Sequence, residues 1–230
     1  ILNNATLVDA KGYLRVESVG VAAITGTGKT SAVTDWLTCD CVLISVGCSP
    51  ALNLASHAGA KVVFDPAIQM HLAINPPQGV SLAGSAASLW TPDRVASHAK
   101  ATGTRAAHLA TGSPAGDDPG SADPGAAAIT HPYPIFKSGK GKEFIDFDED
   151  LTIKDIVNSV KDGYGDIQLV KRYSTAGLGP SQGRHANLNT IRVVSAVTGK
   201  PPEVIGTTTF RPPLVPEKFA HMAGRAFEPT

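Results

Sequence analysis

The chain has 230 residues, enough for one large domain or two smaller ones with a buried core. Apolar residues make up 42% of it and charged residues 17%, a composition that excludes a largely disordered chain. Twenty basic residues balance twenty acidic ones, so charge gives no reason to expect nucleic acid or an anionic membrane as a partner.

Two features bear on location. No apolar run approaches the roughly 20 residues of a membrane-spanning helix, and the first residues, ILNNATLVD, lack the basic and apolar stretches of a signal peptide. The three cysteines, Cys39, Cys41 and Cys48, are odd in number, which argues against a disulfide framework and for the reducing cytoplasm. Because the chain has no initiator methionine, we expect a piece of a longer protein.

The first element predicted along the chain is a strand at 13–24, YLRVESVGVAAI. The overlapping stretch AAITGTGKTSA, at 22–32, resembles a phosphate-binding loop, but alanine stands where that motif needs its first glycine. No long helix follows, and no aspartate ends the next apolar run to hold magnesium. We therefore expect a hairpin with Gly26 and Gly28 in its turn, and no nucleotide triphosphate site.

Three further elements are predicted before residue 112. The continuous apolar run CVLISVG, at 41–47, is typical of a strand covered on both faces, as in a parallel sheet under helices. Residues 79–88 predict a second short strand that turns into a loop, and 92–110 have the apolar spacing of a helix.

The second half of the chain has a different character. Residues 113–141 are dense in Pro, Gly, Asp and Ser without any period, which predicts a linker. A helix capped by Thr152 and Asp155 follows, and further helices are expected at about 166–173 and 188–198. Together these patterns predict an α/β region followed by a small all-α domain.

Two motifs suggest metal sites, and neither is complete. Cys39 and Cys41 would lie on one face of a strand, but a zinc site needs four ligands, so we interpret them as small buried hydrophobes. The acidic run at 146–150, DFDED, lacks the glycine and glutamate of a calcium loop. We expect it to be a solvated approach to the following helix, and we predict no metal site.

A basic group near residue 175 is the strongest candidate for a binding site. Lys171, Arg172 and Arg184 flank a loop that is rich in hydroxyls and glycines, a combination that suits a phosphate or carboxylate ligand. A solvated helix end with basic residues at its C-terminus explains the same pattern equally well. His185 has no acid or nucleophile beside it in the sequence, which favours a structural role. The polar loop residues are Ser174, Thr175, Ser181 and Gln182, with Gly177, Gly179 and Gly183.

Three stretches together resemble the alpha subunit of heterotetrameric sarcosine oxidase. CDCVLISVGCSPALNLASHAGAKVVFD and LAGSAASLWTPDRVASHAKATGTRAAHLATG are similar to the late part of its dinucleotide-binding domain. The most specific likeness is KEFIDFDEDLTIKDI, continued by VKRYSTAGLGPSQGRHANLNTIRVVSAVTG, which is similar to the small domain that follows. GTTTFRPPLVPEKFAHMAGR then resembles the start of an aminomethyltransferase-like folate domain.

The resemblance implies a fold and a domain plan. It implies α/β architecture, the C-terminal portion of an FAD/NAD(P)-binding, Rossmann-like domain, followed by a small all-α domain. The implied parts are a partial FAD/NAD(P)-binding domain (1–112), the linker (113–141), the small helical domain (142–212) and a truncated start of the folate domain (213–230). No G-x-G-x-x-G follows a first strand, so the pyrophosphate-binding half of the dinucleotide fold is expected to be missing.

The resemblance also implies an activity, cofactors and partners. Such complexes oxidise sarcosine to glycine on a flavin of the beta subunit, giving hydrogen peroxide and either formaldehyde or 5,10-methylenetetrahydrofolate. The alpha subunit binds NAD, shares FMN with the beta subunit, binds tetrahydrofolate in its C-terminal domain, and assembles with beta, gamma and delta subunits. The chain would then be part of an oxidoreductase acting on CH–NH groups, inactive by itself.

By the same resemblance, no residue of this chain attacks the substrate. Gly47, Pro50, Gly84 and Ser85 are candidates for lining the dinucleotide site. Lys171, Arg172 and Thr175 are candidates for binding the FMN phosphate. No cysteine follows Cys48, which excludes an iron–sulfur cluster in the helical region.

Two alternatives stay open. The chain is also compatible with a subunit of a related flavoenzyme that oxidises opines, proline or glycine. A non-catalytic adaptor, whose helical segment docks onto a flavoprotein without a cofactor of its own, is the alternative from a different class.

Overall fold

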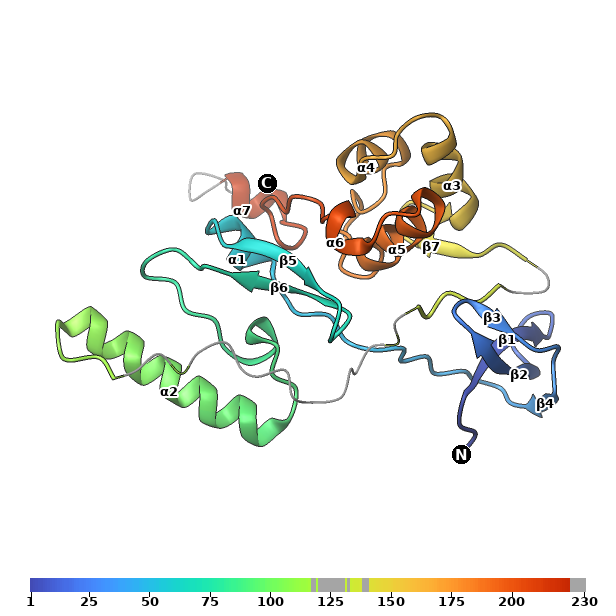
Figure 1. Cartoon of the computed structure of the whole chain (residues 1–230), viewed down its shortest axis with the longest axis horizontal. Helices are drawn as coiled ribbons and strands as arrows, with labels where there is room; N and C mark the ends of the chain where they lie inside the picture. Colours follow the sequence, from blue (N-terminus) through green and yellow to red (C-terminus); the bar gives the residue numbers. More distant parts are fainter. Residues whose placement is uncertain (117–118, 120–130, 132, 138–140, 224–230) are drawn as a thin grey trace.

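The computed structural model describes residues 1–116, 119, 131, 133–137 and 141–223. Figure 1 shows three parts: an N-terminal sheet at the lower right, a hairpin with two helices at the left, and a helical domain above. Among the described residues every strand pair is antiparallel.

The N-terminal part is a four-stranded sheet with β2 at its centre. Strand β2 (Ser18–Gly26) pairs with β1 (Ala5–Lys11), β3 (Lys29–Thr30) and β4 (Asp35–Thr38). Its residues Val19, Val21 and Ala22 are buried. The strand predicted at 13–24 therefore begins later than expected, because residues 13–17 belong to the connection between β1 and β2. The Glu17 N–H donates to the Lys11 carbonyl at 2.8 Å and closes this connection.

The predicted hairpin at the GTGK stretch is confirmed. Ile24 pairs with Thr30 and Gly26 with Lys29, which leaves residues 27 and 28 in the turn. Gly28 has a φ of +65°, a conformation that costs glycine little. A side chain there would also meet the ring of Tyr133, since an added Cβ would lie 3.0 Å from its Cε1. The glycine thus serves the turn and a close contact, not a phosphate.

The strand predicted at 41–47 is wrong. Residues 41–50 have no regular secondary structure, and the side chains of Leu43 and Ile44 are 93% and 74% exposed. A strand needs a neighbour to pair with its backbone, and within the described ranges no segment pairs with this one. Cys39 and Cys41 consequently do not share a strand face, and Cys41 and Cys48 are exposed rather than buried.

The central part contains a hairpin that the sequence patterns missed. After α1 (Asn53–His57), β5 (Lys61–Asp65) and β6 (Met70–Ile74) pair in register from Lys61 with Ile74 to Asp65 with Met70. The Asp65 side chain accepts a hydrogen bond from the Ala67 N–H at 2.8 Å and so closes the turn. The second strand predicted, at 79–88, is wrong: this segment is irregular and ends in a short 3₁₀ helix, η1 (Gly84–Ala87).

The helix predicted at 92–110 is confirmed as α2 (Pro92–Thr111). Pro92 opens it, and Gly112, with a φ of +69°, ends it. None of its residues is buried. Its half-buried side chains are Val95, His98, Thr102 and Arg105, which follow one another at helical spacing.

The C-terminal part is a helical domain preceded by a short ribbon. Strands β7 (Phe144–Asp146) and β8 (Leu151–Thr152) lead into α3 (Ile153–Lys161), α4 (Ile167–Ser174), α5 (Asn187–Thr198) and α6 (Pro202–Ile205), and α7 (Phe219–Ala223) lies near the end. The three predicted helices are thus confirmed. Their shared core consists of Ile145, Ile156, Ile167, Val170, Ala176, Ile191, Val193, Val194 and Ile205.

Local signals fix the ends of these helices. The Asp155 carboxylate accepts hydrogen bonds from the Thr152 N–H at 2.8 Å and from its hydroxyl at 2.7 Å, as the sequence predicted. The Asp166 carboxylate accepts from the Gln168 N–H at 2.9 Å at the start of α4. The predicted α/β class followed by a small helical domain is therefore confirmed.

Most of the predicted linker, 113–141, lies outside the described residues. Its described portion holds the helical domain in place. The Nη2 of buried Arg192, on α5, donates to the His131 carbonyl at 3.0 Å, and Ile135 packs against the helical core.

Candidate functional site

The predicted phosphate-binding residues lie on α4 and at its end. Lys171 and Thr175 are four residues apart and so share one face of the helix, while Arg172 is rotated by about 100° and exposed. Thr175 adopts a φ of +67° and ends the helix, and its hydroxyl donates to the Ser174 carbonyl at 2.6 Å. The structure therefore brings Lys171 and Thr175 together and sets Arg172 beside them.

The side chain of Lys171 is half-buried and lies against the segment 207–209, which follows α6. Its Nζ donates to the Thr209 carbonyl at 3.4 Å. Burial lowers the pKa of its ammonium group, and the positive charge of Arg211 lowers this pKa further. Among the described residues neither cation forms an ion pair with a carboxylate. The ammonium is therefore a partly desolvated charge that has no carboxylate partner among the described residues.

The segment 207–209 is fixed against the helices by side-chain amides. The Nε2 of Gln168, on α4, donates to the Thr207 carbonyl at 3.3 Å and to the Thr209 hydroxyl at 3.2 Å. The Nδ2 of Asn187, on α5, donates to the Thr208 hydroxyl at 3.0 Å. These contacts hold the residues that lead to Arg211 along the face of α4 that carries Lys171.

The glycine-rich loop after α4 is held by two residues of the acidic run. Burial of Asp146 corrects the prediction of a solvated approach at that position, whereas Asp148 and Asp150 are exposed as predicted. Asp146 is 2% exposed, and its two carboxylate oxygens accept from the Gly177 N–H at 2.8 Å and the Asp148 N–H at 3.0 Å. The Asp148 carboxylate accepts from the Ser181 N–H at 2.8 Å, and hydrogen bonding to Ser181 lowers its pKa. Two of the loop amides that were expected to bind an anion, those of Gly177 and Ser181, are thus already paired with carboxylates.

The remaining predicted members of the basic group stay within that loop. The Nε of Arg184 donates to the Ser181 carbonyl at 2.9 Å, and the Arg184 side chain is exposed. His185 is exposed as well, in keeping with the absence of a catalytic partner in the sequence. The candidate site is therefore the Lys171 face of α4 rather than the loop.

The four residues predicted to line a dinucleotide site come from two segments. Gly47 is exposed in the irregular stretch after β4, and Pro50 is buried just before α1. Gly84 opens η1 with a φ of +62°, and Ser85 is half-buried in the same short helix. Of these, the corner at Gly84 and Ser85 immediately precedes residues that line a cavity.

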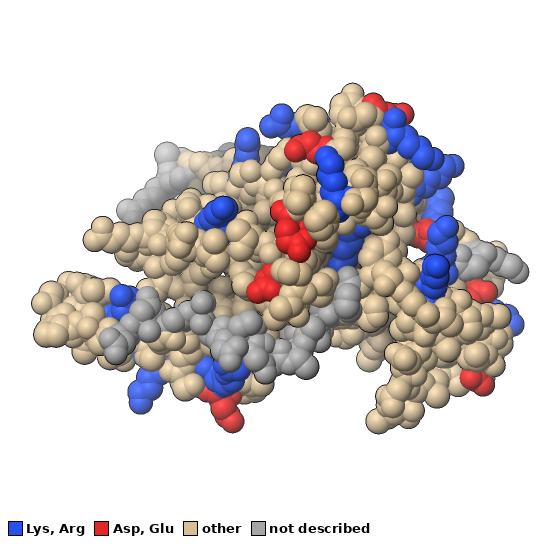
Figure 2. All heavy atoms as spheres, in the orientation of Figure 1, with Lys and Arg blue, Asp and Glu red and all other residues tan. Residues whose placement is uncertain are grey.

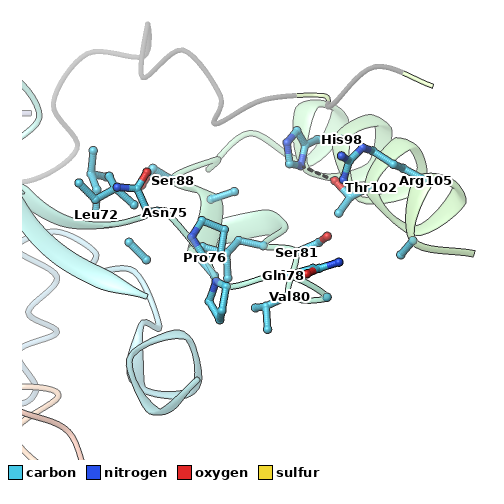
Figure 3. A pocket seen from close by; sticks show the side chains of 18 of the residues that line it. Leu72, Asn75, Pro76, Gln78, Val80, Ser81, Ser88, His98, Thr102 and Arg105 are labelled. Atoms are coloured by element: carbon cyan, nitrogen blue, oxygen red, sulfur yellow. Dashed lines mark hydrogen bonds between the residues drawn. The ribbon is translucent and has the colours of Figure 1, made fainter. Parts of the chain in front are cut away.

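That cavity lies between the end of β6, the loop 75–82, η1 and α2, and has a volume of about 1110 Å³. Figure 3 shows His98, Thr102 and Arg105 of α2 on one side, with Asn75 and Pro76 of the loop across from them. The His98 Nδ1 and the Thr102 hydroxyl are 3.4 Å apart. None of the four residues predicted to line a dinucleotide site is among those that line this cavity.

The sequence predicts no metal site. Cys39, Cys41 and Cys48 form no disulfide, and no group of three or more His, Cys, Asp or Glu residues in the described part of the chain is placed to hold a metal ion. Basic and acidic side chains are interspersed on the face that Figure 2 shows. Of the described helices, none has the length and apolar character needed to span a membrane.

Residues 140–225, which include this site, match the family model of the Sarcosine oxidase A3 domain. Sarcosine oxidase subunit alpha of Rhizobium meliloti (strain 1021) is 31% identical in an alignment that is 239 residues long and spans 94% of this chain. The chain is related to sarcosine oxidase alpha subunits. The corresponding subunits of Corynebacterium sp. strains P-1 and U-96 are each 30% identical over 81% of the chain. The resemblance found in the sequence is thus confirmed.

The chain spans about a fifth of the length of these alpha subunits: 23% of the Rhizobium protein and 20% of each Corynebacterium protein. The fold is similar to that of L-proline dehydrogenase from P. horikoshii, with a TM-score of 0.65 and 19% sequence identity. This similarity covers 93% of the chain and 43% of the proline dehydrogenase chain. The arrangement of the three parts is therefore one that a solved oxidoreductase shares.

The sequence patterns missed the partners of Lys171. Arg211, Thr209 and Gln168 were not predicted to belong to a site. Two of them lie about forty residues after α4, so no helical or strand period connects them to it. Only the fold brings them together.

Proposed function

We propose that this chain is the part of a sarcosine oxidase-type alpha subunit that binds the phosphate of FMN at the Lys171 face of α4. In this proposal the complex oxidises sarcosine to glycine, with formaldehyde or 5,10-methylenetetrahydrofolate and hydrogen peroxide as the other products. Flavin held by the complex would supply the redox chemistry, and this chain would contribute to binding the FMN phosphate. No residue of the chain acts on the substrate.

The observation that carries the proposal is the unpaired, half-buried ammonium of Lys171. Burying a charge is unfavourable unless an opposite charge accompanies it, and among the described residues no carboxylate pairs with this ammonium. A phosphate dianion supplies the missing charge and accepts several hydrogen bonds at once. The residues present therefore fit the phosphate end of FMN: Lys171 holds it, Arg172 adds charge from the neighbouring face, and Thr175 ends the helix beside it.

The relatives extend the proposal to the other parts of the chain. Residues 1–112 would be part of an FAD/NAD(P)-binding domain, with Gly47, Pro50, Gly84 and Ser85 lining the NAD site. Residues 113–141 would be its linker, 142–212 the small helical domain, and 213–230 the start of a tetrahydrofolate-binding domain. We further propose a cytoplasmic complex with beta, gamma and delta subunits, in keeping with three cysteines that form no disulfide.

The test is the double substitution Lys171→Ala plus Arg172→Ala in the alpha subunit of the reconstituted complex. Flavin absorbance per complex and peroxide formation from sarcosine should both fall, since the phosphate loses its cations. The matched control is Lys154→Ala plus Lys161→Ala, which removes the same charge from exposed positions on α3. If flavin content and peroxide formation survive the first pair as well as the second, the phosphate-site assignment is wrong.

The fold similarity to a proline dehydrogenase favours one alternative substrate class. A subunit of an enzyme that oxidises proline, or another secondary amine such as an opine, would need the same phosphate site, because the substrate binds on another subunit. Comparing peroxide formation from sarcosine, proline and glycine in the same complex separates these. A complex that holds flavin independently of this chain would instead support the adaptor.

A further inference from the structure

The segment before the helical domain contacts both that domain and the N-terminal sheet. We call its described residues, 131 and 133–137, the strap. In Figure 1 its yellow-green trace passes beside β3 on the way to β7. Tyr133 and Ile135 are half-buried although the strap has no regular secondary structure. The position of the strap is therefore set by tertiary contacts.

A buried cation anchors the strap to the helical domain. Arg192, on α5, is only 4% exposed, and it donates from Nη2 to the His131 carbonyl at 3.0 Å and from Nη1 to the Asn189 Oδ1 at 3.1 Å. Within the described ranges no carboxylate forms an ion pair with this guanidinium. A buried charge without a counter-charge depends on its hydrogen bonds, so Arg192 needs the His131 carbonyl as an acceptor. Ile135 adds an apolar contact with the helical core.

The other side of the strap lies against the turn of the β2–β3 hairpin. A Cβ at Gly28 would be 3.0 Å from the Tyr133 Cε1 and 3.4 Å from the Ile135 carbonyl oxygen. The lack of a side chain at position 28 therefore allows the ring and the carbonyl to approach the turn. Gly26, in the same hairpin, has open space around its Cα. The close contact thus belongs to Gly28 and is not a general feature of the hairpin.

Contacts within the strap hold its two sides together. The Tyr133 N–H donates to the His131 Nδ1 at 3.0 Å, and the rings of His131 and Phe136 meet edge to face with their centroids 5.6 Å apart. The residue whose carbonyl binds Arg192 therefore also positions the residue whose ring covers Gly28. A displacement at one side of the strap reaches the other through these contacts.

The helix that holds the strap also supports the candidate site. Asn187, on α5 with Arg192, donates from its Nδ2 to the Thr208 hydroxyl at 3.0 Å. Thr208 belongs to the segment 207–209, which lies against Lys171. The strap therefore ends on the helix that fixes this segment.

We propose that the strap couples the N-terminal sheet to the helical domain by fastening the turn of the β2–β3 hairpin to α5, so that the two parts open and move as one unit. The proposal is independent of the phosphate site. It gives Gly28, Tyr133 and Arg192 a joint role, and it requires that a substitution on α5 loosen the distant hairpin.

Hydrogen exchange followed by mass spectrometry, on the alpha subunit in the reconstituted complex, tests this coupling. The reporter is the exchange rate of residues 19–31, whose amides are protected by sheet hydrogen bonds such as that from the Ser31 N–H to the Ala23 carbonyl at 2.9 Å. The reference is the exchange rate of α3, which reports the stability of the helical domain itself.

Arg192→Met removes the anchor and keeps a long apolar side chain. Exchange in residues 19–31 should become about tenfold faster, the effect of losing a hydrogen bond from a charged group. Arg184→Met is the matched control and should change nothing there, since the Arg184 Nε donates to the Ser181 carbonyl in its own loop. Val170→Ala leaves a cavity in the helical core but keeps both anchors of the strap, so it should speed exchange in α3 and not in residues 19–31.

Gly28→Asn tests the other side of the strap. Asparagine tolerates the φ of +65° at this position, so the added Cβ acts mainly through its contact with Tyr133. Exchange in residues 19–31 should become about fivefold faster, because the contact is overpacked. In a Tyr133→Ala background Gly28→Asn should add little, because the ring that it meets is gone. Gly26→Ala, with no neighbouring atom within 4 Å, should not speed exchange.

Two results would overturn the proposal. The first is an exchange rate in residues 19–31 that Arg192→Met leaves unchanged, or raises no more than Val170→Ala does, because the sheet would then not depend on the anchor. The second is an additive effect of Gly28→Asn and Tyr133→Ala, which decides the question alone if the Arg192→Met subunit does not assemble. Neither result bears on flavin content, so a failure of the strap is distinguishable from a failure of the phosphate site.

Discussion

Asp146 shows how a single buried carboxylate can hold a loop next to the candidate site. Its two oxygens each accept one backbone N–H, from Gly177 and Asp148, and water does not reach them. Asp146→Asn replaces one oxygen by an amide donor, which then faces a buried N–H donor. We expect a loss of about 2 kcal/mol in the free energy of unfolding, measured by urea denaturation.

The control for this substitution is Asp150→Asn. Asp150 is exposed and has a φ of +53°, which asparagine also tolerates, so its stability should change by less than about 0.5 kcal/mol. Equal stabilities of the two variants would mean that Asp146 does not organise the loop.

His71 gives a prediction about pH. Burial lowers its pKa to about 4, and the nearby charge of Arg192 adds to this, while a backbone hydrogen bond to Gly206 opposes it. The unfolded chain binds a proton at this position near pH 6.5, whereas the folded chain does not until about pH 4. Stability from this residue is therefore complete above pH 6.5 and is lost as the pH falls towards 4.

We expect the wild-type chain to lose about 2 kcal/mol between pH 7 and pH 4.5 through His71. The His71→Gln variant has a neutral side chain at this position, so its free energy of unfolding should fall by about 2 kcal/mol less between the two pH values. Urea unfolding at pH 7 and pH 4.5 measures this difference. Asp148 and Asp155 have pKa values lowered from 3.8, so they titrate below this window. Parallel pH dependences in the two proteins would contradict a buried neutral His71.

Among the elements, helices were predictable because their signals are local. Thr152 with Asp155, and the glycine at 199, lie within a few residues of the helix ends that they fix. Strands depend on a partner, which the sequence does not reveal. Among the described residues the apolar run 41–47 has no strand to pair with. The β5–β6 hairpin forms although its sequence has a weaker strand pattern, because its two strands pair with each other.

The same distinction divides the candidate site. Helical spacing alone places Lys171 and Thr175 on one face, and a cation with hydroxyls and glycines nearby indicated an anion site. The contact between Lys171 and the Thr209 carbonyl joins residues 38 apart in the sequence and depends on tertiary packing. The sequence also misassigned the acidic run, because burial of Asp146 follows from packing against Gly177 and not from any spacing.

Gly183 and Gly199 have the same backbone conformation, so alanine substitutions at these positions distinguish the cost of backbone strain from the cost of side-chain crowding. Gly183, in the loop, has a φ of +70°, and a Cβ there would meet the side chain of Asn187; Gly199, after α5, has a φ of +69° and open space. Both Gly→Ala changes should cost about 1 kcal/mol for the left-handed conformation. Gly183→Ala should cost about 1–2 kcal/mol more, because it overpacks the loop. Equal losses in urea unfolding would show that Asn187 simply moves aside.

At the scale of the whole molecule, the structure exposes apolar surface that a self-sufficient domain would cover. Leu43 and Ile44 are largely exposed, and α2 buries none of its residues. Surfaces of this kind promote association. We expect the chain to self-associate by light scattering, and Leu43→Ser with Ile44→Ser to reduce this. Leu14→Ser, at an equally exposed site elsewhere, is the control; a monomeric wild-type chain would contradict the expectation.

The relatives are about four times as long as this chain, since 94% of it covers 23% of the Rhizobium protein and 81% of it covers 20% of each Corynebacterium protein. The helical domain carries the family match and the candidate phosphate site on the same residues. In the proposed function, Lys171 contacts a flavin phosphate within the complex.

Phosphorus-31 NMR of the reconstituted complex tests this claim most directly, because the monophosphate of FMN is distinguishable from a pyrophosphate. We predict a monophosphate signal displaced from that of free FMN, which moves back towards the free position in the Lys171→Ala complex and not in the Lys154→Ala complex. A displaced signal that is identical in all three complexes would show that the phosphate binds elsewhere.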